Sequence, residues 1–281
     1  MTPPADFNPD SPHTQQALRL LAEEAARAGA QIAREFFGTA YGVDLKADHS
    51  EVSEADEAAQ VAIIAKLRAT RPHDAFLAEE TLDLSPAPPL PDNDTLCWVI
   101  DPIDGTRNFV RHIPLYTCSV AAMLGGTPLV GAVYDVPRDV MYSASRDGGL
   151  FVNGDLHRSG RVTVSDQQTF SEKRLVALPS SPRGGPAEIA HDWLDKYVCR
   201  ILGSTALHLA LVASGELSGT VADNPRLWDV AAGWVLIHAV GGRMVTPDGE
   251  VVFPLNIAEY REQEFPIVAA SAEACDELLP R

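Results

Sequence analysis

CWVIDPIDGTRNF, residues 97–109, joins an apolar run directly to a turn that carries two carboxylates. The first four residues are typical of a buried strand, and Pro102, which has no N–H to donate, ends regular pairing. Asp101 and Asp104 cannot both be buried without a counter-charge, which a cation between them would supply. Gly105-Thr106 allows a close backbone approach and can offer N–H groups to an anion. A divalent metal ion with a phosphate satisfies this turn; an ordinary Asp-capped turn is the alternative, since Asp-Pro and Asp-Gly are common turn formers.

Length and composition indicate a globular protein. The chain has 281 residues, of which 46% are hydrophobic and 22% charged, which fits one large or two medium domains. No apolar run approaches the ~18 residues that span a bilayer, and the first residues lack the pattern of a signal peptide. The four cysteines have no CxxC spacing, so neither a zinc site nor a disulfide framework is indicated. We therefore expect a cytoplasmic protein that does not bind membranes.

The net charge of −17 limits the classes of ligand. It argues against nucleic acid, because neutralising phosphates requires Lys and Arg. An acidic protein that handles an anionic substrate needs bound cations, which can invert the local sign of charge. The charge thus points again to a metal.

The first half of the chain alternates helix and sheet signals. A tail at residues 1–13 is expected to be disordered, and an amphipathic helix follows, with Pro12 suited to its first position and Gly38 to its end. A second helix opens around Asp56, whose carboxylate fits either a functional role or a plain N-terminal acid. Between residues 116 and 152 short apolar runs and turns predict antiparallel strands.

After about residue 155 short strands alternate with helices, which predicts an α/β layer. We place the boundary there, giving an N-terminal α+β part at 14–155 and a C-terminal α/β part at 156–281. Asp229 is predicted to begin a buried helix. The alternative is a plain N-terminal acid, but a buried carboxylate after Trp228 would require a partner.

Five stretches, in order along residues 45–245, resemble one family, the inositol monophosphatase family. Asp101–Phe109 resembles its DPxDGTxNF signature, and Trp228–Gly233 with Gly241-Gly242 resembles WDxAAG…GG. The other three are Val52–Asp56 (VSEAD), Ala78–Glu80 (AEE) and Gly203–Leu207 (GSTAL).

The resemblance implies an α+β / α/β fold, a layered αβαβα sandwich of the lithium-sensitive, Mg²⁺-dependent phosphatases that include fructose-1,6-bisphosphatase, and a homodimer. It also implies two to three Mg²⁺ ions. The metal ligands implied are Glu79, Asp101, the Ile103 carbonyl, Asp104 and Asp229. The catalytic residues implied are Asp56, Thr106 and Glu79, with Gly105 and Thr106 binding phosphate and Gly203, Ser204 and Asp223 contacting substrate.

The sequence departs from the family pattern at a position where the family contacts the hydroxyl groups of the substrate. Inositol-hydrolysing members carry a Glu seven residues before the Asp of WD, where this chain has Ala222 beside Asp223. His208 stands where an Asp is frequent. We predict a Mg²⁺-dependent phosphomonoesterase acting on a small phosphorylated polyol, sugar or amino alcohol, inositol-1-monophosphatase-like. Histidinol phosphate, fructose 1,6-bisphosphate and adenosine 3′,5′-bisphosphate are alternative substrates. A non-enzymatic regulatory binding protein is a further alternative, which the complete set of acids disfavours.

Overall fold

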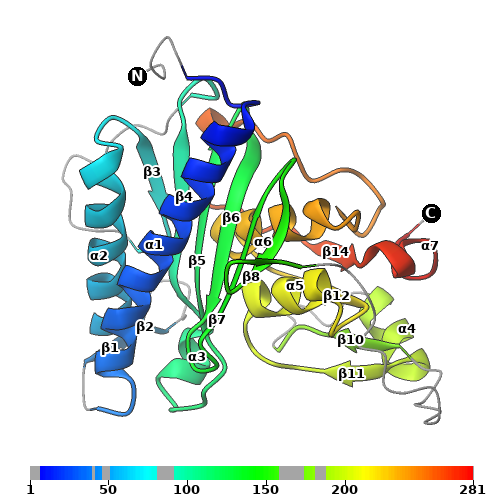
Figure 1. Cartoon of the computed structure of the whole chain (residues 1–281). Helices are drawn as coiled ribbons and strands as arrows, with labels where there is room; N and C mark the ends of the chain where they lie inside the picture. Colours follow the sequence, from blue (N-terminus) through cyan, green and yellow to red (C-terminus); the bar gives the residue numbers. More distant parts are fainter. Residues whose placement is uncertain are drawn as a thin grey trace.

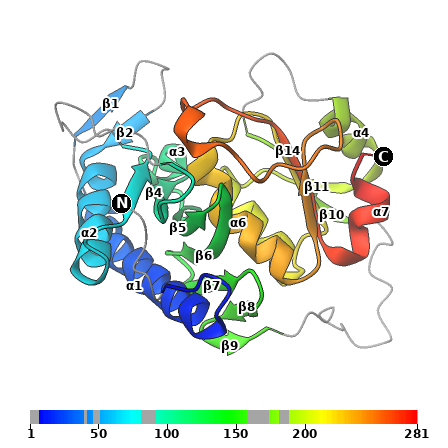
Figure 2. The same cartoon turned by 90° about the horizontal axis from the view of Figure 1, so that it is seen from above.

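The computed structural model describes residues 7–39, 42–45, 51–80, 92–157, 174–180 and 188–280. Two sheets and three layers of helices alternate through the molecule (Figures 1 and 2). Helices α1 and α2 cover one face of the larger sheet, α5 and α6 lie between the sheets, and α4 and α7 pack on the smaller sheet. This αβαβα order confirms the predicted fold class. None of the described helices is both long and apolar enough to cross a bilayer.

The larger sheet has seven strands in chain order. They are β3 (Ala75–Ala78), β4 (Cys97–Asp104), β5 (Thr117–Leu124), β6 (Thr127–Asp135), β7 (Val140–Ser145), β8 (Gly149–Val152) and β9 (Asp155–Leu156). Only β3 and β4 pair in parallel, and the other neighbours are antiparallel. This confirms the antiparallel strands predicted for the middle of the chain. A separate pair, β1 (Val43–Leu45) and β2 (Glu51–Ser53), leads into α2.

The smaller sheet has five strands in the order β11-β10-β12-β14-β13. They are β10 (Leu175–Ala177), β11 (Val198–Arg200), β12 (Gly219–Ala222), β13 (Arg243–Val245) and β14 (Ile267–Ala270). The β10–β11 and β10–β12 pairs are parallel, whereas β14 runs antiparallel to both of its neighbours. The alternation of strand and helix therefore indicated the layer correctly but not the mixed direction of its strands.

The structure describes seven α-helices and two 3₁₀ turns. They are α1 (Pro12–Phe36), α2 (Glu54–Thr70), α3 (Thr106–Phe109), α4 (Glu188–Lys196), α5 (Thr205–Ser214), α6 (Leu227–Ala239) and α7 (Cys275–Leu278), with 3₁₀ turns at Ile257–Glu259 and Ala272–Ala274. Helix α1 starts at Pro12, as its N-terminal Pro predicts. The expected tail, 1–13, lies partly outside the described residues, and its last two residues belong to α1.

Helices α5 and α6 are buried on nearly all sides, because both sheets pack on them. Small residues allow this contact: a Cβ on Gly131 of β6 would lie 2.6 Å from the Ala232 carbonyl of α6. The prediction that Asp229 begins α6 was wrong by two residues. Arg226 is the N-cap, and Asp229 is the third helical residue, where its side chain accepts a bond from the Arg226 N–H.

Candidate metal and phosphate site

Three carboxylates from two layers meet at the end of β4. Oxygen atoms of Asp101, Asp104 and Asp229 lie within 4.8 Å of one another. In a regular strand, residues three apart point to opposite faces. Here the pairing with β5 slips between Asp101, opposite Ser119, and Asp104, opposite Thr117, so the strand has one extra residue. Such a bulge re-aims side chains, which explains how both acids of the 97–109 stretch reach one site.

Asp101 is the most deeply buried of the three acids. Its side chain is 1% exposed, and neither carboxylate oxygen has a hydrogen-bond donor within the described part of the chain. Burial raises the pKa of Asp101 well above its ordinary value, and the charges of Glu79, Asp104 and Asp229 raise it further. A carboxylate with carboxylates for neighbours requires a cation in order to be charged at neutral pH.

The N-terminus of α5 holds Asp104 in place. Its Oδ2 accepts hydrogen bonds from the Ser204 hydroxyl and from the Ala206 N–H, each at 2.6 Å. Burial raises the pKa of Asp104 to about 6, although these two bonds oppose the shift. One oxygen is thus fixed by the helix, which orients the other toward the cluster.

Asp229 is held in the same way by its own helix. The Arg226 N–H donates to its Oδ2 at 2.6 Å. Burial raises the pKa of Asp229 well above its ordinary value, and the neighbouring Asp104 and Glu79 add to the shift. Two of the three acids are therefore held by hydrogen bonds from helix starts, Asp104 by α5 and Asp229 by α6.

A hydroxyl network lies next to these acids. Gly105 adopts φ +100°, and α3 begins at the next residue, Thr106. The Thr106 hydroxyl lies 3.0 Å from the Ile103 carbonyl and 3.2 Å from Asp56 Oδ1, so its single proton is shared between two acceptors. The other Asp56 oxygen accepts hydrogen bonds from the backbone N–H and the hydroxyl of Ser53. Asp56 is fully buried, which leaves Oδ1 directed at Thr106.

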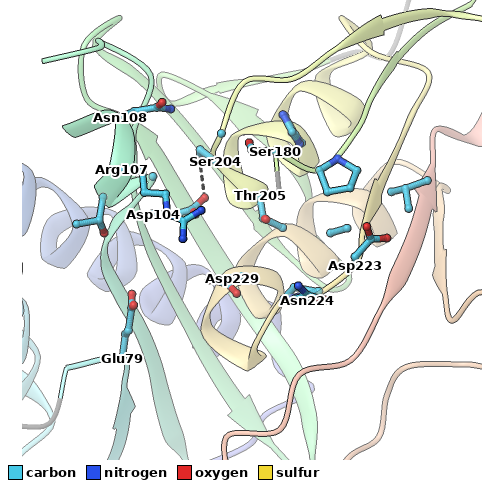
Figure 3. Close-up of a pocket in the computed structure, with 18 residues that line it drawn as sticks. Glu79, Asp104, Arg107, Asn108, Ser180, Ser204, Thr205, Asp223, Asn224 and Asp229 are labelled. Atoms are coloured by element: carbon cyan, nitrogen blue, oxygen red, sulfur yellow. Dashed lines mark hydrogen bonds between the residues drawn. The ribbon is translucent and has the colours of Figure 1, made fainter. Parts of the chain in front are cut away.

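A pocket of about 330 Å³ opens over this network (Figure 3). Most of the site residues expected from the sequence line it: Glu79, Asp104, Gly105, Thr106, Gly203, Ser204, Asp223 and Asp229. Asp56, Asp101 and Ile103 are buried and are not among its lining residues. Ser204, expected to contact substrate, donates its hydroxyl proton to Asp104.

Sequence reasoning missed other lining residues, namely Arg107, Asn108, Ser180, Thr205 and Asn224. Two of them lie inside the 97–109 stretch, so a signal was present. His208, which the sequence analysis noted only as a departure from the family pattern, also lines the pocket, although its side chain is buried. Its Nε2 accepts the Leu202 N–H at 3.1 Å, and burial lowers the pKa of His208 to about 4. His208 is therefore neutral at pH 7.

Comparison with known proteins identifies the family of the chain. A sequence profile of the inositol monophosphatase family matches residues 14–279. The chain belongs to the inositol monophosphatase family. An inositol-1-monophosphatase of Mesorhizobium japonicum is 33% identical over 83% of this chain and 86% of its own. The Nus factor SuhB of Escherichia coli K12 is 31% identical over 80% of this chain and 83% of its own.

Solved structures agree with the family assignment. The extragenic suppressor protein SuhB of Bartonella henselae superposes with a TM-score of 0.76 at 25% identity, covering 93% of this chain and 96% of its own. An inositol monophosphatase of Anabaena superposes with a TM-score of 0.70 at 26% identity over 94% of each chain. This member of the inositol monophosphatase family is a phosphoric monoester hydrolase with an acidic cluster suited to metal.

Proposed function

We propose that this protein is a Mg²⁺-dependent phosphomonoesterase that hydrolyses a small phosphorylated polyol or sugar, with inositol monophosphate the first substrate to test. The observation that carries the proposal is the buried Asp101 carboxylate, which has three acidic neighbours that all line the pocket. The Mesorhizobium japonicum relative is named an inositol-1-monophosphatase, which supports the choice of inositol 1-monophosphate.

The donor set fits Mg²⁺, which prefers carboxylate, carbonyl and water oxygens. We assign Glu79, Asp101 and the Ile103 carbonyl to one ion, Asp101, Asp104 and Asp229 to a second, and Glu79 to a weaker third. Bound Mg²⁺ would lower the pKa of a coordinated water and neutralise charge on the phosphate.

The chain's own residues supply proton transfer and orientation. We assign Thr106 to orient the attacking water through its hydroxyl oxygen. The hydroxyl proton passes to Asp56 Oδ1, 3.2 Å away, as the hydroxyl oxygen accepts a proton from that water. Ser53 keeps Asp56 Oδ2 occupied, so that only Oδ1 is available for this transfer.

The phosphate and the substrate body are assigned to different residues of the pocket. Gly105 and Thr106 bind phosphate through their N–H groups, while Gly203, Ser204 and Asp223 line the space for the body. Ala222 offers no hydrogen-bonding side chain there, and a lost charge-assisted bond is worth ~1.5–3 kcal/mol. We therefore expect weak discrimination for inositol, and histidinol phosphate, fructose 1,6-bisphosphate and adenosine 3′,5′-bisphosphate stay as alternatives.

A regulatory role is the second candidate, because one relative is named a Nus factor. The complete acidic cluster favours catalysis, since a protein without catalytic function has no need for buried repelling carboxylates. The homodimer implied by the resemblance and the cytoplasmic location expected from the composition stay predictions.

The test is a phosphate-release screen over inositol phosphates, sugar phosphates, histidinol phosphate and glycerol 2-phosphate, with Mg²⁺ or with EDTA. We expect release only with Mg²⁺, and its loss in Asp101→Asn. Asp155→Asn, the same chemical change at an exposed position of β9, serves as the control. Absence of Mg²⁺-dependent release from every substrate would favour the regulatory role.

A further inference from the structure

Arg107 stands out among the charged residues of the pocket. The described residues that line the pocket include four carboxylates, Glu79, Asp104, Asp223 and Asp229. Arg107 is the one Arg or Lys among those lining residues. His208 does not add a second positive charge, since its lowered pKa keeps it neutral at pH 7.

The guanidinium of Arg107 has donors available for a ligand. It forms no hydrogen bond or ion pair with any residue that the structure describes, although several other arginines, such as Arg71 and Arg138, pair with acids. Its side chain is exposed at the pocket. A guanidinium whose donors are not used by the acids around it can donate them to an anion that enters the pocket.

The backbone that carries Arg107 is held firmly. The neighbouring Asn108 Nδ2 donates to the carbonyls of Leu115 and Leu202, each at 2.7 Å. A Cβ on Gly203 would lie 2.6 Å from the same amide nitrogen, so α3 and the segment before α5 are in close contact. Phe109 is fully buried. Arg107 is therefore presented from a fixed base.

The position of Arg107 relates it to the substrate. It directly follows Gly105-Thr106, assigned above to the phosphate, and it lines the same pocket as Asp223 and Asn224 (Figure 3). A group on the substrate next to the scissile phosphate would thus meet a guanidinium on this side of the pocket.

We propose that Arg107 binds a second anionic group of the substrate, a carboxylate or a second phosphate, and so makes doubly anionic phosphomonoesters preferred. This inference rests on the proposed phosphatase function. The planar guanidinium can donate two parallel hydrogen bonds to either group, which Lys cannot do. Asp223, the one acid of the pocket lining that we do not assign to metal, would by itself repel a second negative charge on the substrate.

The test measures kcat/KM for two matched substrate pairs in Mg²⁺. In one pair 3-phosphoglycerate is compared with glycerol 3-phosphate, which lacks the carboxylate. In the other, release of the 1-phosphate from fructose 1,6-bisphosphate is compared with release from fructose 1-phosphate. We expect kcat/KM of the doubly anionic substrate to exceed that of its singly anionic partner by about tenfold in at least one pair. The pair that shows this preference identifies the group bound as a carboxylate or as a phosphate.

Arg107→Gln should bring that ratio down to about one, and Arg107→Lys should keep part of it because it keeps the charge. Arg200→Gln makes the same charge change at an exposed residue outside the pocket lining, and should leave the ratio unchanged.

Three outcomes would overturn the inference while leaving the phosphatase function standing. The first is hydrolysis with equal kcat/KM for both members of each pair. The second is a ratio of kcat/KM values that Arg107→Gln does not change. The third is an equal loss of kcat/KM for both members of a pair in Arg107→Gln. The last would mean that Arg107 binds the scissile phosphate. Absence of hydrolysis of every substrate in the wider screen would instead remove the function on which the inference rests.

Discussion

At the scale of single residues, the acidic cluster opposes folding until a cation binds. Asp101 is buried with a raised pKa and three acidic neighbours, so its charge disfavours the folded state in the absence of metal. Asn has nearly the same shape and no charge. We predict that Asp101→Asn removes nearly all turnover and raises the free energy of unfolding in EDTA by about 1 kcal/mol or more, the equivalent of one pKa unit.

Urea unfolding at pH 8, with EDTA and then with Mg²⁺, checks this prediction. Mg²⁺ should stabilise the wild type and the Asp155→Asn control, because a ligand that binds only the folded state adds stability. It should stabilise Asp101→Asn far less. An Asp101→Asn protein that is less stable than the wild type in EDTA, or that turns over normally, would contradict the assigned role.

His208 gives the protein a dependence on pH that is separate from the acids. Its folded pKa of about 4 lies below the ordinary value of 6.5, so protons bind the unfolded chain more strongly. Stability from neutral His208 is complete above pH 6.5 and is lost as pH falls toward 4, by up to ~3 kcal/mol.

His208→Gln keeps an acceptor for the Leu202 N–H but does not titrate. We predict that the difference in unfolding free energy between the wild type and His208→Gln shifts in favour of the variant as pH falls from 6.5 to 4. Denaturant unfolding of both proteins along this series measures the difference, in which the titration of the acids cancels. A difference that is constant with pH would show that His208 is not held neutral.

At the scale of elements, the start of α5 joins helix stability to metal binding. The Ser204 hydroxyl accepts the Leu207 N–H at 3.1 Å as a helix cap and donates to Asp104. We predict that Ser204→Ala lowers the free energy of unfolding by about 1 kcal/mol, the usual loss for a cap. It should also raise the Mg²⁺ concentration needed for half-maximal activity, because the bond that lowers the pKa of Asp104 is gone.

Ser214→Ala is the matched control, since Ser214 ends the same helix and its hydroxyl donates to the Ala210 carbonyl. It should leave the Mg²⁺ requirement unchanged. Equal Mg²⁺ requirements in Ser204→Ala and wild type would show that Ser204 is only a cap.

The elements themselves were largely predictable from the sequence. Apolar patterns predicted the helix that starts at Pro12 and the antiparallel strands between residues 116 and 152, and the structure has both. Motif resemblance pointed to Asp101, Asp104 and Asp229, which the structure brings together. The bulge in β4 and the bond from Ser204 to Asp104 were not predictable, because each depends on register and packing between segments that are distant in the sequence.

At the scale of the whole molecule, the two parts of the chain on either side of the predicted boundary near residue 155 share one hydrophobic core. One hydrophobic cluster contains Val99 and Val133 of the larger sheet, Val230 of α6, and Ile267 of the smaller sheet. The acidic site likewise takes residues from β4 and from α6. We therefore predict that the two parts of the chain unfold as one cooperative unit rather than as separate domains.

Gly131→Ala tests this, because a Cβ at Gly131 of β6 would lie 2.6 Å from the Ala232 carbonyl and so push the larger sheet from α6. Overpacking of this kind costs ~1–3 kcal/mol. Hydrogen exchange at increasing denaturant would follow amides of β5 and of β14, one strand from each sheet. If the molecule unfolds as one unit, the substitution lowers the protection free energy of both strands by the same amount. Loss confined to β5 would establish two independently unfolding domains.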